Sequence, residues 1–271
     1  MITSLKKMRD YRVSATDGEI GKVDEFFIDD HNWTIRYLAV DAGHWFHKKK
    51  VLLPAEALNH TQNHALIVDR TKQQVSRSPD IESFRHISRS QEIELLDHYN
   101  APYYWDRPQY TPARLYNPNT GLNFIGEKYP VDQSRDSVER RDADILQHAK
   151  NHEASTTTHE HHLQESKELI GYTMHAADGD IGPVHNMAVD DQHWVIRYLV
   201  VDAGNWLRHR EILVAPQWIE SVRWEDRRIE TFFHRQMFKN SPEFNKSFPI
   251  ARDYEEKIFS YYKQPPYWES R

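Results

Sequence analysis

One stretch of this chain occurs twice. Residues 31 to 45 read HNWTIRYLAVDAGHW and residues 192 to 206 read QHWVIRYLVVDAGNW, with ten of fifteen positions identical. The offset of 161 residues also relates DGEIG at 17–21 to DGDIG at 178–182. An internal repeat restricts the possible folds because each copy must adopt the same structure. The repeated positions are Asp17, Gly18, Gly21, Trp33, Arg36, Asp41 and Gly43 in the first copy and Asp178, Gly179, Gly182, Trp194, Arg197, Asp202 and Gly204 in the second.

The repeat extends over a whole domain. With small loop insertions the two copies stay aligned as far as HYNAPYYWD, which ends at Asp106, and YYKQPPYWE, which ends at Glu269. A chain of 271 residues is long enough for about two ordinary domains. We therefore expect domains at 1–106 and 168–271, joined by a partly disordered linker at 107–167.

The first part of each copy has the pattern of β-structure. Asp-Gly between extended flanks is a strong hairpin signal, and WTIRYLAVD is rich in β-branched and aromatic residues. Both faces of that segment mix apolar with polar residues, so we expect a strand covered on both sides. Further strands are expected at KVLLPA, HALIVD, EILVA and RIETFF. Five or six short strands with tight turns are typical of a small barrel, which removes exposed sheet edges.

The later part of each copy has the pattern of a helix. Ser90 and Asp253 are candidate N-caps, because each stands just before an acidic residue of the first turn. An apolar stripe follows, and proline then ends each helix before the aromatic tails APYYW and QPPYW. We expect these tails to pack on the barrels. The stripe consists of Leu95, Leu96 and Tyr99 in the first copy and of Ile258, Phe259 and Tyr262 in the second.

These segments resemble the PRC-barrel family, which is named from the cytoplasmic domain of the photosynthetic reaction-centre H subunit. The resemblance rests on DGEIGKVDEFFIDDHNWTIRYLAVDAG followed by VLLP, and on the matching stretch of the second copy. It implies two tandem small β-barrels with helical extensions, a mainly β fold that acts as an assembly or interaction module. In the H subunit the domain caps a membrane complex near a quinone site, and a related barrel in a ribosome maturation factor binds a ribosomal protein.

Composition excludes several kinds of function. The net charge of -6 gives no reason to expect a nucleic-acid partner. Charges interrupt every apolar run, so we expect no membrane span and no secretory signal. Without cysteine the chain cannot form a disulfide, a thiolate metal site or a cysteine nucleophile. Phosphate-cradling glycine motifs are also absent from the sequence. We expect a cytoplasmic protein that is not an enzyme and holds no cofactor.

The repeated Asp41 and Asp202 are the obvious candidates for chemistry. An acid–base role would need a partner, and His44 beside Asp41 is replaced by Asn205 in the second copy. We therefore assign no catalytic residue, and predict that each aspartate ends a strand and caps the following turn.

Arg36 and Arg197 lie in the middle of a strand among apolar residues, where burial would require an acidic partner. Asp24 on the preceding strand could serve in the first copy, but its counterpart is His185. Because a shared partner is missing, we predict that both arginines keep their charged ends in water.

Two further groups are candidate binding residues. The loops at 47–50 and 208–210 are basic in both copies and, with a nearby tryptophan, form a possible interaction surface for an acidic partner or an anion. Solvated charges at a hairpin tip are the alternative. The histidines of HEHH could bind a metal weakly, but the spacing is not HExxH and we assign no metal site. The surface residues are Trp45, Lys48, Lys49, Lys50, Trp206, Arg208 and Arg210, and the metal candidates are His159, His161 and His162.

Two functions remain open from the sequence. The first is a non-enzymatic interaction or assembly module with an unknown protein partner, in which the two copies face each other as a pseudo-dimer. The second is ligand binding, or quinone-related electron transfer of the reaction-centre H kind, in a cleft between the barrels.

Overall fold

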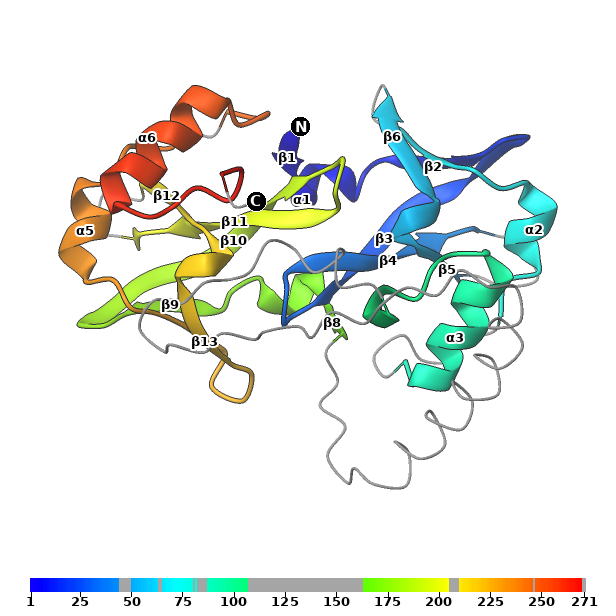
Figure 1. Ribbon diagram of the computed structural model, residues 1–271, viewed down its shortest axis with the longest axis horizontal. Helices are drawn as coiled ribbons and strands as arrows, with labels where there is room; N and C mark the ends of the chain where they lie inside the picture. Colours follow the sequence, from blue (N-terminus) through cyan, green and yellow to red (C-terminus); the bar gives the residue numbers. More distant parts are fainter. Residues whose placement is uncertain are drawn as a thin grey trace, which may run out of the picture.

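Each sequence repeat folds into six strands in the same chain order (Figure 1). The computed structural model describes residues 1–43, 50–62, 65–79, 81, 87–106, 163–204, 210–245 and 247–269, with the backbone alone for 59–62. We refer to residues 1–106 as the first unit and to residues 163–269 as the second. The strands of the first unit are β2 (Arg12–Ala15), β3 (Gly18–Asp29), β4 (Thr34–Asp41), β5 (Lys50–Pro54), β6 (Leu58–Gln62) and β7 (Ala65–Val68). Those of the second are β9 (Thr173–Ala176), β10 (Gly179–Asp190), β11 (Val195–Asp202), β12 (Glu211–Val214), β13 (Ile219–Arg223) and β14 (Arg228–Thr231).

The two units also share their strand pairing. The order is β5-β4-β3-β2-β7-β6 in the first unit and β12-β11-β10-β9-β14-β13 in the second. Only the β2–β7 and β9–β14 pairs in these orders are parallel. In each unit a 3-10 helix joins the two strands at opposite ends of this order, β5 to β6 and β12 to β13. The sheet therefore curls around its core. These helices are η1 (Ala55–Ala57) and η6 (Pro216–Trp218).

The core confirms the expected burial of the repeated strand. Every residue of β4 except Asp41 is buried, because the strand is covered on both faces. The Asp-Gly turns join β2 to β3 and β9 to β10, as the sequence predicts. The predicted class, mainly β with helical extensions, is confirmed. None of the helices within the described ranges combines the length and hydropathy that a membrane-spanning helix requires.

Helices follow the strands in each unit. The predicted apolar stripes are buried on α3 and α6, with every member at most 2% exposed. The predicted N-caps are wrong, because Ser90 and Asp253 are each the second residue of their helix. Ser88 caps α3 and forms a reciprocal capping box with Gln91, whereas α6 follows Ala251 without a side-chain cap. The helical segments are α2 (Lys72–Ser76), α3 (Arg89–His98), η2 (Tyr104–Asp106), α5 (Arg235–Asn240) and α6 (Arg252–Tyr262).

Two short segments, which we call the arms, form the beginning of the two units, before the six strands of each. The first arm contains β1 (Ile2–Ser4) and α1 (Leu5–Met8), and the second contains β8 (Leu163–Glu165) and η4 (Ser166–Leu169). The second arm begins at residue 163, within the range of the predicted linker, 107–167. Three residues are too few for an alternating pattern to predict a strand. The remainder of that linker lies outside the described residues.

Each arm pairs with a strand of the other unit. Strand β1 pairs antiparallel with β10, matching Ile2 with Asp190 and Ser4 with Ala188. Strand β8 pairs antiparallel with β3, matching Leu163 with Asp29. These registers are equivalent, because all four strands shift by the same 161 residues between the copies. In Figure 1 the dark blue β1 and α1 accordingly lie beside β10 of the second unit.

Candidate functional site

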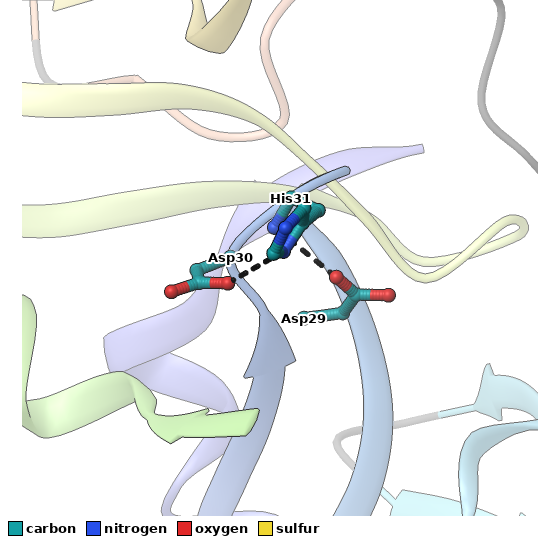
Figure 2. A group of neighbouring side chains, drawn as sticks. All are labelled: Asp29, Asp30 and His31. Carbon is teal, nitrogen blue, oxygen red and sulfur yellow. Dashed lines mark hydrogen bonds and ion pairs between the residues drawn. The ribbon is translucent and has the colours of Figure 1, made fainter. Parts of the chain in front are cut away.

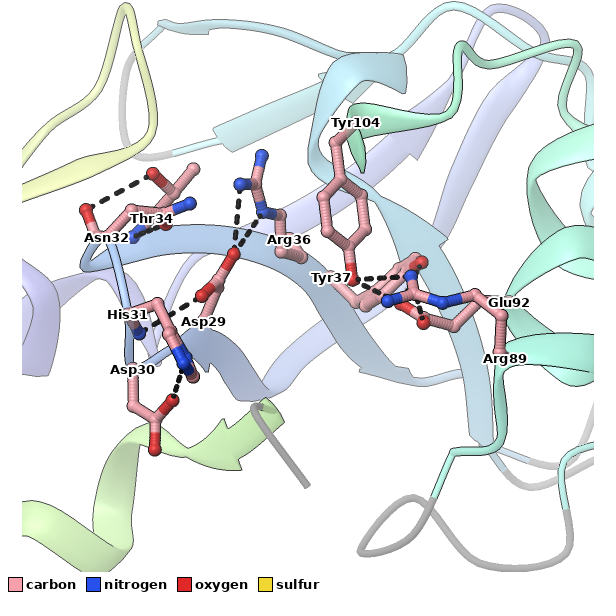
Figure 3. Close-up of polar contacts among 10 residues, drawn as sticks. All are labelled: Asp29, Asp30, His31, Asn32, Thr34, Arg36, Tyr37, Arg89, Glu92 and Tyr104. Carbon is pink, nitrogen blue, oxygen red and sulfur yellow. Dashed lines mark hydrogen bonds and ion pairs between the residues drawn. The ribbon is translucent and has the colours of Figure 1, made fainter. Parts of the chain in front are cut away.

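Arg36 lies in a buried ion pair in the middle of β4. Its Nε and Nη2 donate to Oδ2 of Asp29 at 3.2 and 3.0 Å, and only 3% of the residue is exposed. Its guanidinium carbon lies 4.0 Å from the centre of the Tyr104 ring (Figure 3). The prediction that this arginine keeps its charge in water is therefore wrong. The suggested partner is also wrong, because Asp24 pairs with Lys50, with 2.8 Å between Oδ2 and Nζ.

The second unit contains the equivalent pair. Nη2 of Arg197 donates to Oδ2 of Asp190 at 3.0 Å, and the guanidinium carbon lies 3.8 Å from the centre of the Tyr267 ring. Nδ1 of His193 lies 2.8 Å from the same carboxylate oxygen. Burial acts to raise the pKa of Asp190, but the hydrogen bonds from His193 and Arg197 outweigh it and hold that pKa below its ordinary value. Arg197 is thus half-buried and paired with Asp190, with 16% of its side chain exposed, so the shared acidic partner that the prediction excluded exists.

A buried glutamate forms the other half of each cluster. In the first unit Oε1 of Glu92 accepts hydrogen bonds from the hydroxyls of Tyr37 at 2.8 Å and Tyr104 at 2.7 Å. Oε2 accepts from Nη1 of Arg89 at 2.8 Å (Figure 3). Burial raises the pKa of Glu92, against the lowering effect of Arg89 and the two hydroxyls. This carboxyl joins strand β4, helix α3 and the aromatic tail.

The equivalent glutamate of the second unit is Glu255. Its Oε1 accepts from the hydroxyls of Tyr198 at 2.7 Å and Tyr267 at 2.9 Å, and its Oε2 lies 3.1 Å from Nη1 of Arg252. Burial again raises the pKa of the carboxyl. Arg252 lies 4.0 Å from the centre of the Trp268 ring, as Arg89 lies 3.9 Å from that of Trp105. The tails therefore pack on the barrels, as expected, through one constellation used twice.

The sequence contained a signal for these clusters that our reasoning missed. Asp29 and Asp190 are both repeated at the offset of 161, like the arginines they bind. The predicted candidate was Asp24 on the preceding strand, whereas Asp29 lies at the end of that strand, opposite Thr34. A register shift between Phe27 and Ile28 makes this end of the strand difficult to place from the sequence.

The hydroxyl of Tyr267 gives a prediction about pH. Burial first, and then the carboxylate of Glu255, raises the pKa of Tyr267 to about 12. An unfolded tyrosine ionises near pH 10, so the stabilisation from this hydroxyl is complete below about pH 10 and is lost as pH rises through about 12. We expect the stability difference between wild type and Tyr267→Phe to be constant below about pH 10. Above it, the difference should shift against the wild type by up to about 2 kcal/mol.

Urea denaturation at a series of pH values measures the free energy of unfolding of the wild type and of Tyr267→Phe. Only the difference between the two proteins is compared, so ionisation of other groups cancels. A difference that stays constant up to pH 12 would show that Tyr267 is not protected from ionisation in the folded protein.

Asp29, Asp30 and His31 form a group with the composition of a metal site (Figure 2). Their nearest ligand atoms all lie within 4.8 Å of one another. Oδ2 of Asp29 already binds Arg36, and its Oδ1 accepts from the amide of His31 at 3.1 Å. These contacts belong to the turn after β3, and we assign no metal to them. The predicted metal candidates His159, His161 and His162 lie outside the described residues.

The repeated aspartates at the ends of β4 and β11 have the predicted turn role. Oδ1 of Asp41 accepts from the amide of Gly43 at 3.0 Å, and Oδ1 of Asp202 accepts from that of Gly204 at 2.9 Å. His44 and Asn205 lie outside the described residues. The argument from the difference between these two residues therefore remains a prediction from the sequence.

Only two residues of the predicted interaction surface can be placed. Lys50 is held by Asp24, and Arg210 donates to the carbonyl oxygens of Lys239 and Ser241. Both side chains are thus engaged within their own unit. Trp45, Lys48, Lys49, Trp206 and Arg208 lie outside the described residues.

A pocket of about 390 Å³ lies beside the second cluster. Its wall combines Met1 and Ile2 of the first arm with charged and aromatic residues of the second unit. The second-unit residues are Asp190, Gln192, His193, Arg197, Ile250, Arg252, Glu255, Tyr267 and Trp268. The pocket therefore lies between the arm of one unit and the barrel of the other.

The comparison with protein families agrees with the fold. Residues 4–75 match the model of the PRC-barrel domain. This range extends from the first arm through the six strands of the first unit into α2. None of the curated proteins compared with the chain matches it. The match identifies residues 4–75 as a PRC-barrel domain.

Proposed function

We propose that this protein is a non-enzymatic assembly module in which two PRC-barrel-like units pack on each other as a pseudo-dimer. The observation that carries the proposal is the reciprocal pairing of the arms, β1 with β10 and β8 with β3. Exchange of equivalent segments between like units is how domain-swapped dimers form. A duplicated chain can hold such a dimer together covalently and present one fixed surface to a partner.

Contacts between the strands β4 and β11 support the same arrangement. The amide of Ile35 donates to the carbonyl of Trp194 at 2.7 Å, and that of Ile196 donates to the carbonyl of Trp33 at 2.8 Å. Both tryptophans have left-handed backbone conformations, with φ of 58° and 55°. The Trp194 ring also stacks on Phe26 of the other unit, with centroids 6.4 Å apart. These equivalent contacts relate the two units as a two-fold axis would.

The buried clusters support a role without catalysis. Glu92 and Glu255 have raised pKa values, which catalytic acids also show. Yet both oxygens of each carboxyl accept hydrogen bonds or ion pairs from the protein itself. Such groups attach the aromatic tail to the barrel and have no oxygen directed at a substrate.

Cleavage of the chain between the units tests the assembly. We expect a protein with a protease site inserted at 145–155 to remain one complex after cleavage, because the arms still hold both halves. Size-exclusion chromatography with light scattering measures the mass of the cleaved protein at falling concentration. An insertion at the same place without the protease sequence is the control. Halves that separate freely, each folded and monodisperse, would contradict the proposal.

A second candidate function is ligand binding between the units, and the pocket beside Arg197 favours it. Two arginines and a histidine line it beside the carboxylates of Asp190 and Glu255, and the buried Nε of Arg197 has no hydrogen-bond partner in the described structure. This wall suits a small anion better than an apolar quinone. A thermal-shift titration with phosphate, citrate and a soluble quinone tests the idea, with Arg252→Gln as the comparison. Stabilisation by none of the three would contradict it.

A further inference from the structure

We infer that the two arms carry different polar contacts that make each unit pair with the unlike unit rather than with a second copy of itself. The inference rests on the proposed assembly and specifies its partner choice. It follows from a comparison of the two places where an arm meets a barrel. We call them the acidic junction, around Glu25, and the amide junction, around Asn186, which occupies the position equivalent to Glu25 at the offset of 161.

At the acidic junction a buried carboxylate faces the second arm. Oε1 of Glu25 accepts from Oγ of Ser166 at 2.5 Å and from Nη2 of Arg9 at 3.1 Å. The same Nη2 donates to Oγ of Ser166 at 2.8 Å, and Nζ of Lys167 lies 3.8 Å from Oε2 of Glu25. Glu25 is only 2% exposed, so this carboxylate depends on its partners for compensation. Two of those partners, Ser166 and Lys167, belong to the second arm.

At the amide junction a neutral side chain faces the first arm. Nδ2 of Asn186 donates to Oγ of Ser4 at 2.8 Å, and its Oδ1 accepts from the amide of Lys6 at 3.2 Å. Leu5, the residue equivalent to Ser166, is apolar and 2% exposed. The position equivalent to Arg9 is Ile170. The residues at the positions of Glu25 and Arg9 are therefore both uncharged at this junction.

Pairing of like units would bring the wrong residues together. If two first units paired, the arm residue facing Glu25 would be Leu5 in place of Ser166. The buried carboxylate of Glu25 would then lose the hydrogen bond from Ser166 and would face an apolar side chain instead. If two second units paired, Asn186 would meet an arm with Ser166 where Leu5 now packs. A buried carboxylate that loses one hydrogen bond and faces an apolar surface is a repulsive element that discriminates between partners. The acidic junction is therefore the stronger discriminator.

A pairing experiment on the cleaved protein tests this inference. Each half of the cleaved protein is prepared in two versions that carry different tags. The mixture is unfolded in urea and refolded, and native mass spectrometry counts the pairs of like and of unlike halves. We expect unlike pairs to exceed like pairs by at least tenfold. Glu25→Asn gives the acidic junction the side chain that Asn186 supplies at the amide junction, and it should raise the share of paired first halves at least fivefold. Glu19→Asn, an exposed change on the same strand, should leave the share unchanged.

Each outcome has one meaning. Like and unlike pairs in statistical proportion would overturn the inference while leaving the assembly intact, whereas single halves would overturn the assembly and the inference with it. A second measurement on the uncut chain does not depend on refolding of separate halves. We expect Ser166→Leu to lower the urea midpoint more in the wild type than in the Glu25→Asn background. The double variant would combine asparagine with leucine, which is the combination of Asn186 and Leu5 at the amide junction. Equal losses in both backgrounds would also overturn the inference.

Discussion

Replacement of Asp29 by alanine is expected to lower the free energy of unfolding by about 3–5 kcal/mol, the usual cost of leaving one member of a buried ion pair without its partner. The side chains of Arg36 and Asp29 are 4% and 9% exposed. Without the carboxylate, the guanidinium would keep the Tyr104 ring as a neighbour but would lose its two hydrogen bonds to Asp29. Urea denaturation followed by circular dichroism measures the change.

The matched control is Asp24→Ala, which removes the other candidate partner suggested by the sequence. Asp24 and Lys50 have side chains 30% and 42% exposed, and an ion pair of this exposure contributes less than about 1 kcal/mol. A larger loss for Asp24→Ala than for Asp29→Ala would show that Arg36 is not held as the structure describes.

Replacement of Gly182 by alanine has the second-largest expected effect, about 3 kcal/mol or more. A Cβ atom on Gly182 would lie 1.8 Å from the carbonyl oxygen of Asp202, and the φ of 156° is itself unfavourable for other residues. The obstacle is backbone of the neighbouring strand, which cannot move without disturbing the pairing of β10 with β11. Gly21 has the same close approach, 2.1 Å from the carbonyl oxygen of Asp41.

Gly43→Ala separates the two causes. Gly43 has a φ of 63°, but a Cβ atom there would have no neighbour within 4 Å. Its replacement should cost only the left-handed backbone penalty, roughly 1–2 kcal/mol. Thermal unfolding of the two variants compares the losses. Equal losses would mean that the strands do not approach each other as closely as the structure shows.

The internal repeat made much of the fold predictable. Comparing the copies distinguished strand and helix positions that either copy alone would have left uncertain, and the buried stripes of α3 and α6 were found in this way. The turn role of Asp41 was also predictable, because the contact is local and both copies share it. Contacts of this kind depend on residues close in the chain, where spacing alone fixes the geometry.

The rest depends on contacts between distant residues. The partner of Arg36 required knowledge of the register between β3 and β4, which shifts near Phe27. The arms required knowledge of which unit accepts them, and strands of three residues carry no periodic pattern. The cluster around Glu92 combines a helix and the tail that follows it with a strand more than fifty residues earlier in the chain. Its signal in the sequence was present only as equivalent polar residues in both copies.

Hydrogen exchange at the amides of Ile35 and Ile196 tests the central claim, that the two units are joined through equivalent contacts. Each amide donates to a tryptophan carbonyl of the other unit. We predict that both exchange as slowly as the amide of Leu38 in the buried middle of β4, when measured by NMR on the intact protein. Rapid exchange at Ile35 and Ile196 while Leu38 stays protected would contradict the account.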